Sequence, residues 1–427
     1  MTTAPPSDAV AAVLAGLPAL DWLEATYTDF HAHPELSHGE TRSAAICAAK
    51  LRDLGYEVTE QLGGTGVVGI LENNPPDGPA GPVVMFRADM DGLPVAEDTG
   101  LPYASTDTGL DRHGIEHPTM HACGHDFHMT WLLAAAELLA AGREHWSGTF
   151  VALFQPAEET GDGAIAMVED GLVDRVPRPD VVLGQHVGPE RAGSVHVRPG
   201  PTMSRSENLR IVVHGKGGHG SMPHYTIDPI VVAASLVMNL QTVVSRTLSG
   251  AEFGVVTVGM LQAGTKANII PASAELHVNI RSYDDAVHDR IIAAIRRIAV
   301  GQAAAAGCPR EPEISSYDQV PLTDNDPEIA EQVRAALEDA GQPVTFGEKV
   351  TGSEDFSWLP RAWDVPYAYW FVGGWDEAAY DALQAENRLL ELPSNHSPFF
   401  GPTMHPTLET GVRSAVVSSL TFLGRHE

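Results

Sequence analysis

Hydrophobic residues in the first and last parts of the chain gather in short, near-continuous runs that end abruptly in polar residues. The runs are Pro82–Gly92, Thr149–Glu159, Asp180–Gly188 and Pro366–Gly374. Apolar runs of this length are typical of strands in a sheet that is covered on both faces. Helical stretches lie between them, notably Asp126–Gly142, in which Asp126 is placed to cap the helix. The alternation of strand and helix predicts an α/β sheet.

The middle of the chain has a different pattern. LRIVVHG, AEFGVVTVGMLQ and SAELHVNIRSY alternate polar and apolar residues like half-exposed strands, and helical stretches intervene near Pro229–Ser245 and Ala286–Ala306. Such a pattern favours an α+β domain in which helices cover one face of an antiparallel sheet. Because α/β-type segments resume after about Tyr317, we predict a second domain, residues 203–316, inserted into a discontinuous first domain, residues 1–202 and 317–427.

Charge and cysteine content restrict the possible partners and the compartment. Lys and Arg number 26 against 56 Asp and Glu, a formal net charge of −30, which argues against nucleic acids and anionic membrane surfaces as partners. The longest uncharged apolar run, Pro229–Ser245, carries Asn239 and Gln241, so we expect a buried helix there and no membrane span. Three cysteines and the lack of a basic N-terminal region predict a reduced, cytoplasmic protein.

The stretch HACGHDFH, His121–His128, concentrates possible metal ligands. Cys123 and His125 are two residues apart, so in a turn they present a thiolate and an imidazole on one side, which suits zinc or another transition metal. Two ligands cannot complete a site. The ends of the predicted strands and a Ser/Asn/Pro loop near the C-terminus supply more, and the candidate set is Cys123, His125, Glu159, His186 and His396.

Glu158 and Glu159 are adjacent carboxylates at a predicted strand end. Neighbouring side chains point in different directions, so one can bind metal while the other acts as a general base. Alternatively, the pair is the solvated start of a helix, and Cys123 is a nucleophile with His121 or His125 as its base. We favour the metal site, because a metal-bound thiolate accounts for the carboxylate pair and a nucleophile does not.

Nine segments that span nearly the whole chain carry a resemblance to a known family. They are HPELSHGE (His33–Glu40), Phe86–Ser105, Met120–Ala136, QPAEETGDGA (Gln155–Ala164), GQHVGP (Gly184–Pro189), Gly215–His224, Asn268–Leu276, TGSEDFS (Thr351–Ser357) and NHSPFF (Asn395–Phe400). In this order they resemble the amidohydrolase branch of the aminoacylase/carboxypeptidase superfamily of metallohydrolases, which holds hippurate hydrolases, N-acyl-amino-acid hydrolases and plant auxin-conjugate hydrolases. The resemblance implies a metallopeptidase-like catalytic domain with a mixed, largely parallel sheet flanked by helices, and an inserted α+β lid or dimerisation domain.

The resemblance implies one or two divalent ions, with zinc favoured by the thiolate and manganese or cobalt as alternatives. Arg87 stands where many members of the wider superfamily place a metal-binding His, which leaves the number of ions open. In a site with two ions, the thiolate of Cys123 would bridge them, His125 and His186 would complete one, and Glu159 and His396 the other.

The resemblance also implies roles around the metal. Glu158 would be the general base, and Asp89 would orient a ligand from behind. His219, on the smaller domain, would reach the partner subunit's active site and help to stabilise the tetrahedral oxyanion. Asn268 and Arg281 match positions that grip the substrate's carboxylate. The alternatives are a structural role for His219 and a surface salt bridge for Arg281.

These roles describe metal-dependent hydrolysis of the amide bond of N-acyl-amino acids, such as hippurate-like or N-acetyl-amino-acid substrates. The same site could serve a dipeptidase, a carboxypeptidase or a biosynthetic N-deacetylase. An inactive metal-binding scaffold is the non-enzymatic alternative, but it would have lost a ligand or the base, and the sequence retains them all. A homodimer through the lid domain is implied by the resemblance alone.

Overall fold

The computed structural model describes residues 7–75 and 80–424, which divide into two compact units. The second unit comprises Met203–Thr323 and Lys349–Glu354, and the remainder forms the first unit. The predicted domain boundary at residue 316 falls inside strand β15 (Glu313–Val320), which pairs with the second unit's sheet as far as Val320. A bridge between Met203 and Val350 ties the segment 349–354 to the same unit, which chain order did not reveal.

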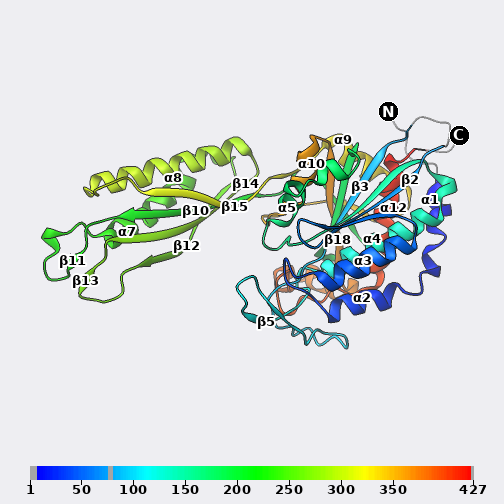
Figure 1. The fold of residues 1–427 in the computed structure, drawn as a ribbon, viewed down its shortest axis with the longest axis horizontal. Coiled ribbons are helices and arrows are strands. Elements are labelled where there is room, and N and C mark those ends of the chain that lie inside the picture. Colours follow the sequence, from blue (N-terminus) through cyan, green and yellow to red (C-terminus); the bar gives the residue numbers. More distant parts are fainter. Residues whose placement is uncertain (1–6, 76–79, 425–427) are drawn as a thin grey trace. The chain divides into compact units, whose positions relative to one another are not determined.

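An eight-stranded mixed sheet flanked by helices organises the first unit, and this confirms the predicted fold class (Figure 1). The strands, in spatial order, are β1 (Glu57–Leu62), β2 (Gly66–Asn73), β6 (Gly148–Gln155), β3 (Val83–Asp89), β7 (Val181–Arg191), β18 (Tyr367–Trp375), β8 (Val195–Val197) and β17 (Val344–Phe346). The four central strands, β6, β3, β7 and β18, are mutually parallel and are the four predicted apolar runs. Every residue of β6 is buried, which explains the unbroken apolar pattern.

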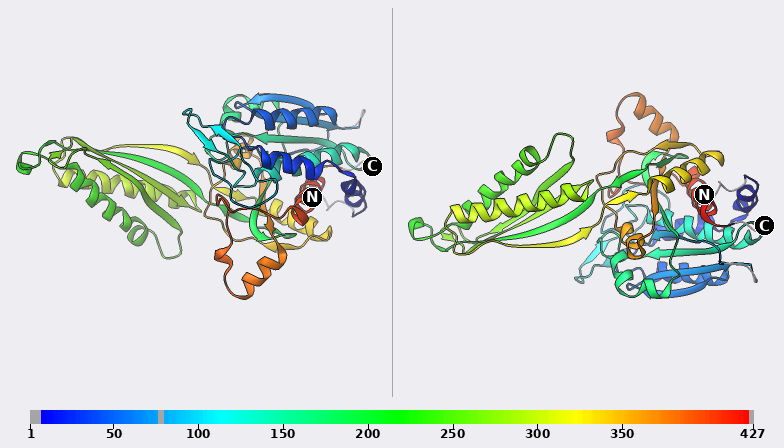
Figure 2. Two further views of the ribbon diagram at one scale, coloured as in Figure 1. Left: turned by 90° about the horizontal axis from the view of Figure 1, so that it is seen from below. Right: turned by 90° about the horizontal axis from the view of Figure 1, so that it is seen from above.

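Helices cover both faces of this sheet (Figure 2). On one face α4 (His125–Ala141) and α12 (Met404–Phe422) pack against each other and against β3 and β7, and on the other α5 (Gly163–Glu169) and α10 (Trp358–Trp363) contact β6 and β7. Almost all of α4 is buried, so it places the metal-ligand motif at the centre of the unit. The remaining helices are α1 (Ser7–Leu14), α2 (Leu23–Ala32), α3 (Thr41–Asp53), α6 (Leu172–Arg175), α9 (Pro327–Asp339) and α11 (Glu377–Ala385).

The prediction that Asp126 caps α4 is wrong. The helix begins one residue earlier, at His125, and the N-cap residue is Gly124 with a left-handed φ of 85°. The Asp126 carboxylate instead forms a buried ion pair, in which its Oδ2 accepts a hydrogen bond from His31 Nδ1 at 2.7 Å.

The second unit contains a four-stranded antiparallel sheet in the order β12–β14–β10–β15. Its first three strands in that order are β12 (Gly254–Ala263), β14 (Ser273–Ser282) and β10 (Arg205–His214), which correspond to the three predicted half-exposed strands. Two helices, α7 (Pro229–Thr242) and α8 (Asp285–Ala305), pack on one face and share an apolar core with the sheet.

The expectation that Pro229–Ser245 is a buried helix holds for only one face. Leu236 and Leu240 pack into the core, whereas Val231 and Met238 are 64% and 71% exposed. By length and composition alone, Pro229–Thr247 is one described helix that could cross a membrane, and the bent pair Asp8–Ala19 and Leu23–Ala32 could count as a second span. This is weak evidence, since core helices of soluble proteins pass the same test.

His31 joins helix α2 to the start of α4. Its ring lies between two carboxylates, with Nδ1 2.7 Å from Asp126 and Nε2 3.0 Å from Glu97, and it is 1% exposed. Burial alone lowers the pKa of a histidine, but hydrogen bonds to Asp126 and Glu97 outweigh burial and raise the pKa of His31 to about 9. The imidazolium therefore carries the positive charge that two buried carboxylates require.

We predict that His31→Ala destabilises the first unit by about 3–5 kcal/mol near pH 6.5, because it leaves the buried carboxylates of Asp126 and Glu97 without their positively charged partner. Because the pKa of His31 in the folded protein lies above the unfolded value of about 6.5, protonated His31 stabilises the folded state fully below that pH. This contribution is lost as the pH rises through about 9. The difference between wild type and variant should therefore shrink from pH 6.5 to 9.5 in urea unfolding followed by circular dichroism. The exposed His113→Ala is the control, and a difference that does not vary with pH would contradict the ion-pair assignment.

Candidate metal centre

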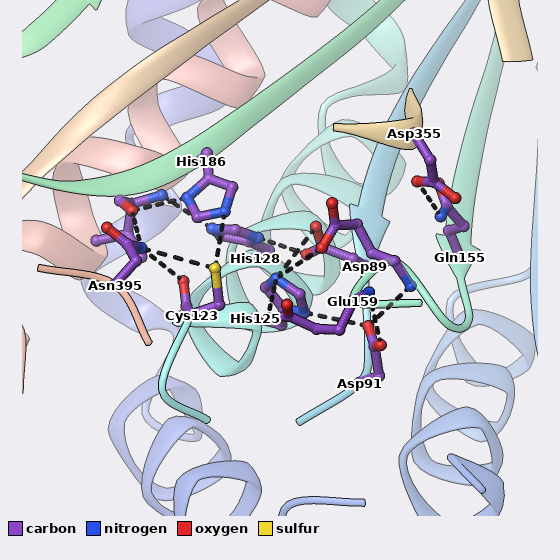
Figure 3. Close-up of polar contacts among 12 residues, drawn as sticks. Asp89, Asp91, Cys123, His125, His128, Gln155, Glu159, His186, Asp355 and Asn395 are labelled. Carbon is purple, nitrogen blue, oxygen red and sulfur yellow. Dashed lines mark hydrogen bonds and ion pairs between the residues drawn. The ribbon is translucent and has the colours of Figure 1, made fainter. Parts of the chain in front are cut away.

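The five candidate ligands all lie in the first unit. Figure 3 shows four of them, Cys123, His125, Glu159 and His186, beside the carboxyl ends of the central strands. Cys123 and His125 stand at the start of α4, Glu159 follows β6, and His186 lies in β7, two residues beyond the Arg87–Gly184 pairing. His396 comes from the loop before α12. The fold thus brings together residues that are up to 273 positions apart in the sequence, from Cys123 to His396.

Gly124 lets Cys123 and His125 face the same side. Its backbone is left-handed, with φ 85°, and a Cβ atom at this position would lie 2.2 Å from Val187 Cγ1. Only glycine meets both conditions without strain. The Cys-Gly-His order is therefore a requirement of the turn that feeds α4, and it places the thiol and the imidazole within reach of one centre.

The hydrogen bonds of the two buried histidines leave one nitrogen of each for a ligand. His186 Nδ1 donates to the Val187 carbonyl at 2.7 Å, so its Nε2 lone pair faces Cys123 Sγ at 3.4 Å. His125 Nδ1 lies 3.2 Å from Asp91 Oδ1, and its Nε2 has no hydrogen-bond partner among the described residues. Backbone and carboxylate partners on the far nitrogen are what fixes the orientation of metal-binding histidines.

Glu159 and His396 complete the group. His396 Nε2 lies 3.3 Å from Glu159 Oε2, and the other oxygen, Oε1, is buried without a hydrogen bond in the described part of the chain. The His396 backbone donates to the Ala122 carbonyl at 2.8 Å, and Asn395 Nδ2 donates to the Cys123 carbonyl at 3.2 Å. The late loop is therefore fastened directly to the Cys-Gly-His turn.

The electrostatics of the centre fit a cation. Burial lowers the pKa of His125, yet Asp89 and Asp91 more than offset it and raise the pKa to about 10. Burial, together with Asp91 and Asp89, raises the pKa of Glu159 to about 8. Ligand atoms of Cys123, His125 and Glu159 lie within 4.8 Å of one another. The negative potential that favours protonation here would also favour a bound cation, whose ligands must lose their protons.

Sequence reasoning did not identify His128, although it clusters with Asp89, His125 and His186. Its Nδ1 lies 2.5 Å from Asp89 Oδ1, and its Nε2 accepts a hydrogen bond from the Val187 backbone at 2.9 Å. With both nitrogens engaged, His128 supports the centre and does not offer a ligand atom. The sequence could have indicated His128, because a residue three positions after His125 lies on the same face of a helix.

Asp89 is placed differently from the expected role of orienting a ligand. Its carboxylate binds His128 and, at 2.6 Å, Arg87 Nη1, and its nearest approach to His125 is 3.5 Å from the Nε2 that faces the centre. Asp91 is the carboxylate on the far nitrogen of His125. Arg87, 1% exposed, neutralises Asp89 through this ion pair. In the segment ADMDG, the second aspartate, Asp91, was the available sign of the contact with His125, and the sequence-based prediction did not use it.

The remaining predicted residues lie in the second unit. His219 on β11 (Gly218–His219) pairs with Ile269 on β13 (Ile269–Ile270), so Asn268 lies next to it. Arg281 is near the far end of β14, roughly 25 Å away by the rise of a strand. Its guanidinium contacts Thr351 O, Ser353 Oγ and Asn279 Oδ1, and no ion pair of Arg281 is found in the described chain, so the surface salt bridge does not form.

Comparisons with known proteins point to one family. The model for peptidase family M20/M25/M40 matches residues 85–386. Thermostable carboxypeptidase 1 of Saccharolobus solfataricus is 37% identical over 358 residues, 83% of this chain and 86% of that protein. Hippurate hydrolase of Campylobacter jejuni is 36% identical over 348 residues, 79% of this chain and 85% of that protein. The solved structure of Bacillus subtilis YXEP, a dinuclear metal binding peptidase, has a TM-score of 0.74 at 28% identity and covers 94% of this chain and 97% of that one.

We predict that metal-free protein titrated with Co²⁺ shows a thiolate-to-cobalt charge-transfer band in the near ultraviolet. Cys123→Ser should abolish the band because the sulfur ligand is gone, whereas Cys308→Ser, a free cysteine of the second unit, should retain it. Absorption spectroscopy makes the measurement. A full-strength band in Cys123→Ser would show that this thiol is not a ligand.

Proposed function

The chain belongs to peptidase family M20/M25/M40, whose members are hydrolases, and on that premise we propose that it hydrolyses the amide bond of N-acyl-amino acids. The observation that carries the proposal is the convergence of Cys123, His125, Glu159, His186 and His396 beside Glu158. Relatives of nearly equal identity are named a carboxypeptidase and a hippurate hydrolase. Both names describe amides whose amine side is an amino acid with a free carboxylate, and we propose this class as the substrate.

In the proposed arrangement Cys123, His125, Glu159, His186 and His396 hold one or two divalent ions. A bound ion of this kind acts as a Lewis acid and lowers the pKa of water toward neutrality. The thiolate and the two imidazoles favour zinc, and manganese or cobalt remain alternatives. His125 Nε2 and Glu159 Oε1 are buried and make no hydrogen bond within the described residues, which supports the ligand assignment.

Glu158 is proposed as the general base. Its carboxylate lies 3.9 Å from His125 Nε2, and its side chain is 10% exposed, so it faces the centre while a water can still reach it. It would take the proton of the attacking water and pass it to the departing amine. General bases held in this way contribute about 10²–10⁴-fold to the rate.

Three residues of the second unit would act on the substrate. Arg281 has only neutral acceptors, so its charge is available to the substrate's carboxylate, which suits a planar guanidinium. His219 Nδ1 accepts from the Ser221 backbone at 3.1 Å, so in the neutral ring the proton is on Nε2. That N–H is a donor suited to an oxyanion. Asn268, next to His219, would assist in binding the carboxylate.

A homodimer formed through the second unit would allow His219, Asn268 and Arg281 to act on one substrate. His219 and Asn268 lie at the opposite end of the unit from Arg281, so a second subunit would supply the former pair to a site that uses its own Arg281. The exposed apolar side chains of Val231 and Met238 on α7 and the unpaired edge of β12 support an interface between two copies. We place the enzyme in the cytoplasm, consistent with three free cysteines.

Carboxypeptidase or dipeptidase activity is the second candidate, because a carboxypeptidase is among the similar relatives. A biosynthetic N-deacetylase would use the same groups. The acyl side of the substrate separates these candidates, so a panel of N-benzoyl- and N-acetyl-amino acids and dipeptides decides between them.

We predict that the wild type releases amino acids from the acylated members of this panel and that Glu158→Gln reduces kcat by about 10²–10⁴-fold. Metal content, measured by mass spectrometry, should not change, since Glu158 is not a proposed ligand. Glu144→Gln, whose side chain is 81% exposed, is the control. Unreduced turnover in Glu158→Gln would refute the base assignment, and cleavage of dipeptides alone would favour the second candidate.

For the dimer we predict that His219→Ala loses turnover but retains metal. Mixing it with Glu158→Gln should restore activity, because some hybrid sites combine an intact His219 with an intact Glu158. His224→Ala, an exposed histidine of the same unit, is the matched control and should remain active. Met238→Glu in both partners should prevent restoration by disrupting the proposed interface. Absence of restoration after demonstrated subunit exchange would count against a role across the dimer.

A further inference from the structure

Asp91 joins three separate parts of the chain at the metal centre. It lies two residues beyond β3 and is 1% exposed, and each of its oxygens receives two hydrogen bonds. Oδ1 accepts from His125 Nδ1 at 3.2 Å and from the Glu158 backbone at 3.2 Å. Oδ2 accepts from the Glu159 backbone at 3.0 Å and from Ser37 Oγ at 2.6 Å. One carboxylate therefore contacts the candidate ligand His125 and the backbone of both Glu158 and Glu159. Figure 3 shows Asp91 beside His125 and Glu159.

A second buried carboxylate, that of Glu40, holds the residue before the pair. Its Oε1 accepts from the Ala157 backbone at 2.8 Å and from the His38 backbone at 2.9 Å, and its Oε2 accepts from Thr65 Oγ1 at 2.6 Å. Ala157 has a left-handed φ of 51°. Three successive N–H groups, those of residues 157–159, thus turn toward two carboxylates, an arrangement known as an anion-binding nest.

We propose that Asp91, supported by Glu40, is the positioning residue that fixes the general base Glu158 and the ligands His125 and Glu159 in one working arrangement. The inference rests on the proposed function, because it gives a purpose to the placement of Glu158. It also assigns a role to the HPELSHGE segment, which supplies Ser37 and Glu40 as the outer supports. Misplacing a catalytic group by about 1 Å can cost about 10²-fold in rate.

The two carboxylates differ in a way that allows a matched test. Both oxygens of Asp91 face a backbone N–H, so an asparagine amide must turn its NH₂ group toward one of them, and a backbone N–H cannot reverse its role. Only Oε1 of Glu40 faces backbone N–H groups, and Oε2 faces the hydroxyl of Thr65, which can rotate to accept from an amide. Asp91→Asn should therefore displace the turn, and Glu40→Gln should disturb it much less.

The experiment compares these two variants with the wild type at saturating metal. For Asp91→Asn we expect kcat to fall about 100-fold with KM within about threefold, and Co²⁺ affinity to fall about 10–100-fold because the far nitrogen of His125 loses its charged acceptor. For Glu40→Gln we expect kcat to fall less than about tenfold. In metal-free protein, amide hydrogen exchange of a peptide spanning 155–162 should be faster in Asp91→Asn than in the wild type.

Three results would overturn the inference. Equal losses of kcat in the two variants would mean that only the buried charge matters. Recovery of full kcat in Asp91→Asn with excess metal would limit the role of Asp91 to metal binding. Unchanged amide hydrogen exchange in the peptide 155–162 would show that Asp91 does not hold the turn. If Asp91→Asn does not fold, Ser37→Ala removes one hydrogen bond to the same carboxylate and should lower kcat about threefold to tenfold; an unchanged kcat there would have the same meaning. A wild type that cleaves no substrate would refute the proposed function, whereas exchange and metal affinity would still decide the role of Asp91.

Discussion

The concentration of buried negative charge around His125 is the constraint on which the rest of the centre depends. The carboxylates of Asp89, Asp91, Glu158 and Glu159 gather there, and the side chains of the last two are only 10% and 7% exposed. Buried carboxylates are costly without positive partners or hydrogen-bond donors. Arg87 neutralises Asp89, and backbone N–H groups satisfy Asp91. A divalent cation bound by Cys123, His125 and Glu159 would supply the remaining positive charge, so the centre and its ligand chemistry follow from one electrostatic requirement.

The fold meets this requirement by dividing the work between strands and turns. Parallel central strands bring Asp89 and His186 to one level of the sheet, and the turn after β6 presents Glu158 and Glu159 on a backbone whose N–H groups are held by side chains. His128 connects Asp89 to the backbone beside His186. Rigid elements thus set the distances, while hydrogen bonds to carboxylates set the orientations, which is the arrangement that catalysis by positioned groups needs.

Features that depend on local pattern could be read from the sequence. The central strands were predictable because burial on both faces removes the alternation of polar and apolar residues. Cys123 and His125 were candidates because they lie two residues apart. Asp91 could not be predicted, since its partners Ser37 and Glu158 lie 54 and 67 positions away and spacing carries no information about such contacts.

The failures have physical causes of the same kind. The expected cap at Asp126 failed because the left-handed Gly124 starts the helix one residue earlier, and the Asp126 carboxylate binds His31, 95 residues away. The exposed side of α7 could not be foreseen, because the sequence of an apolar helix does not tell which of its apolar residues pack against the core and which remain exposed. The segment 349–354 joins the second unit through pairing with Met203, which chain order conceals.

The central claim is that this centre hydrolyses amides by means of a bound metal. The most direct test measures amino-acid release from N-benzoyl-glycine and a set of N-acetyl-amino acids, using protein as purified, protein stripped by a chelator, and stripped protein supplied with zinc, manganese or cobalt. The account predicts release that vanishes on stripping and returns with at least one of the metals. Release that persists undiminished in fully stripped protein would contradict it.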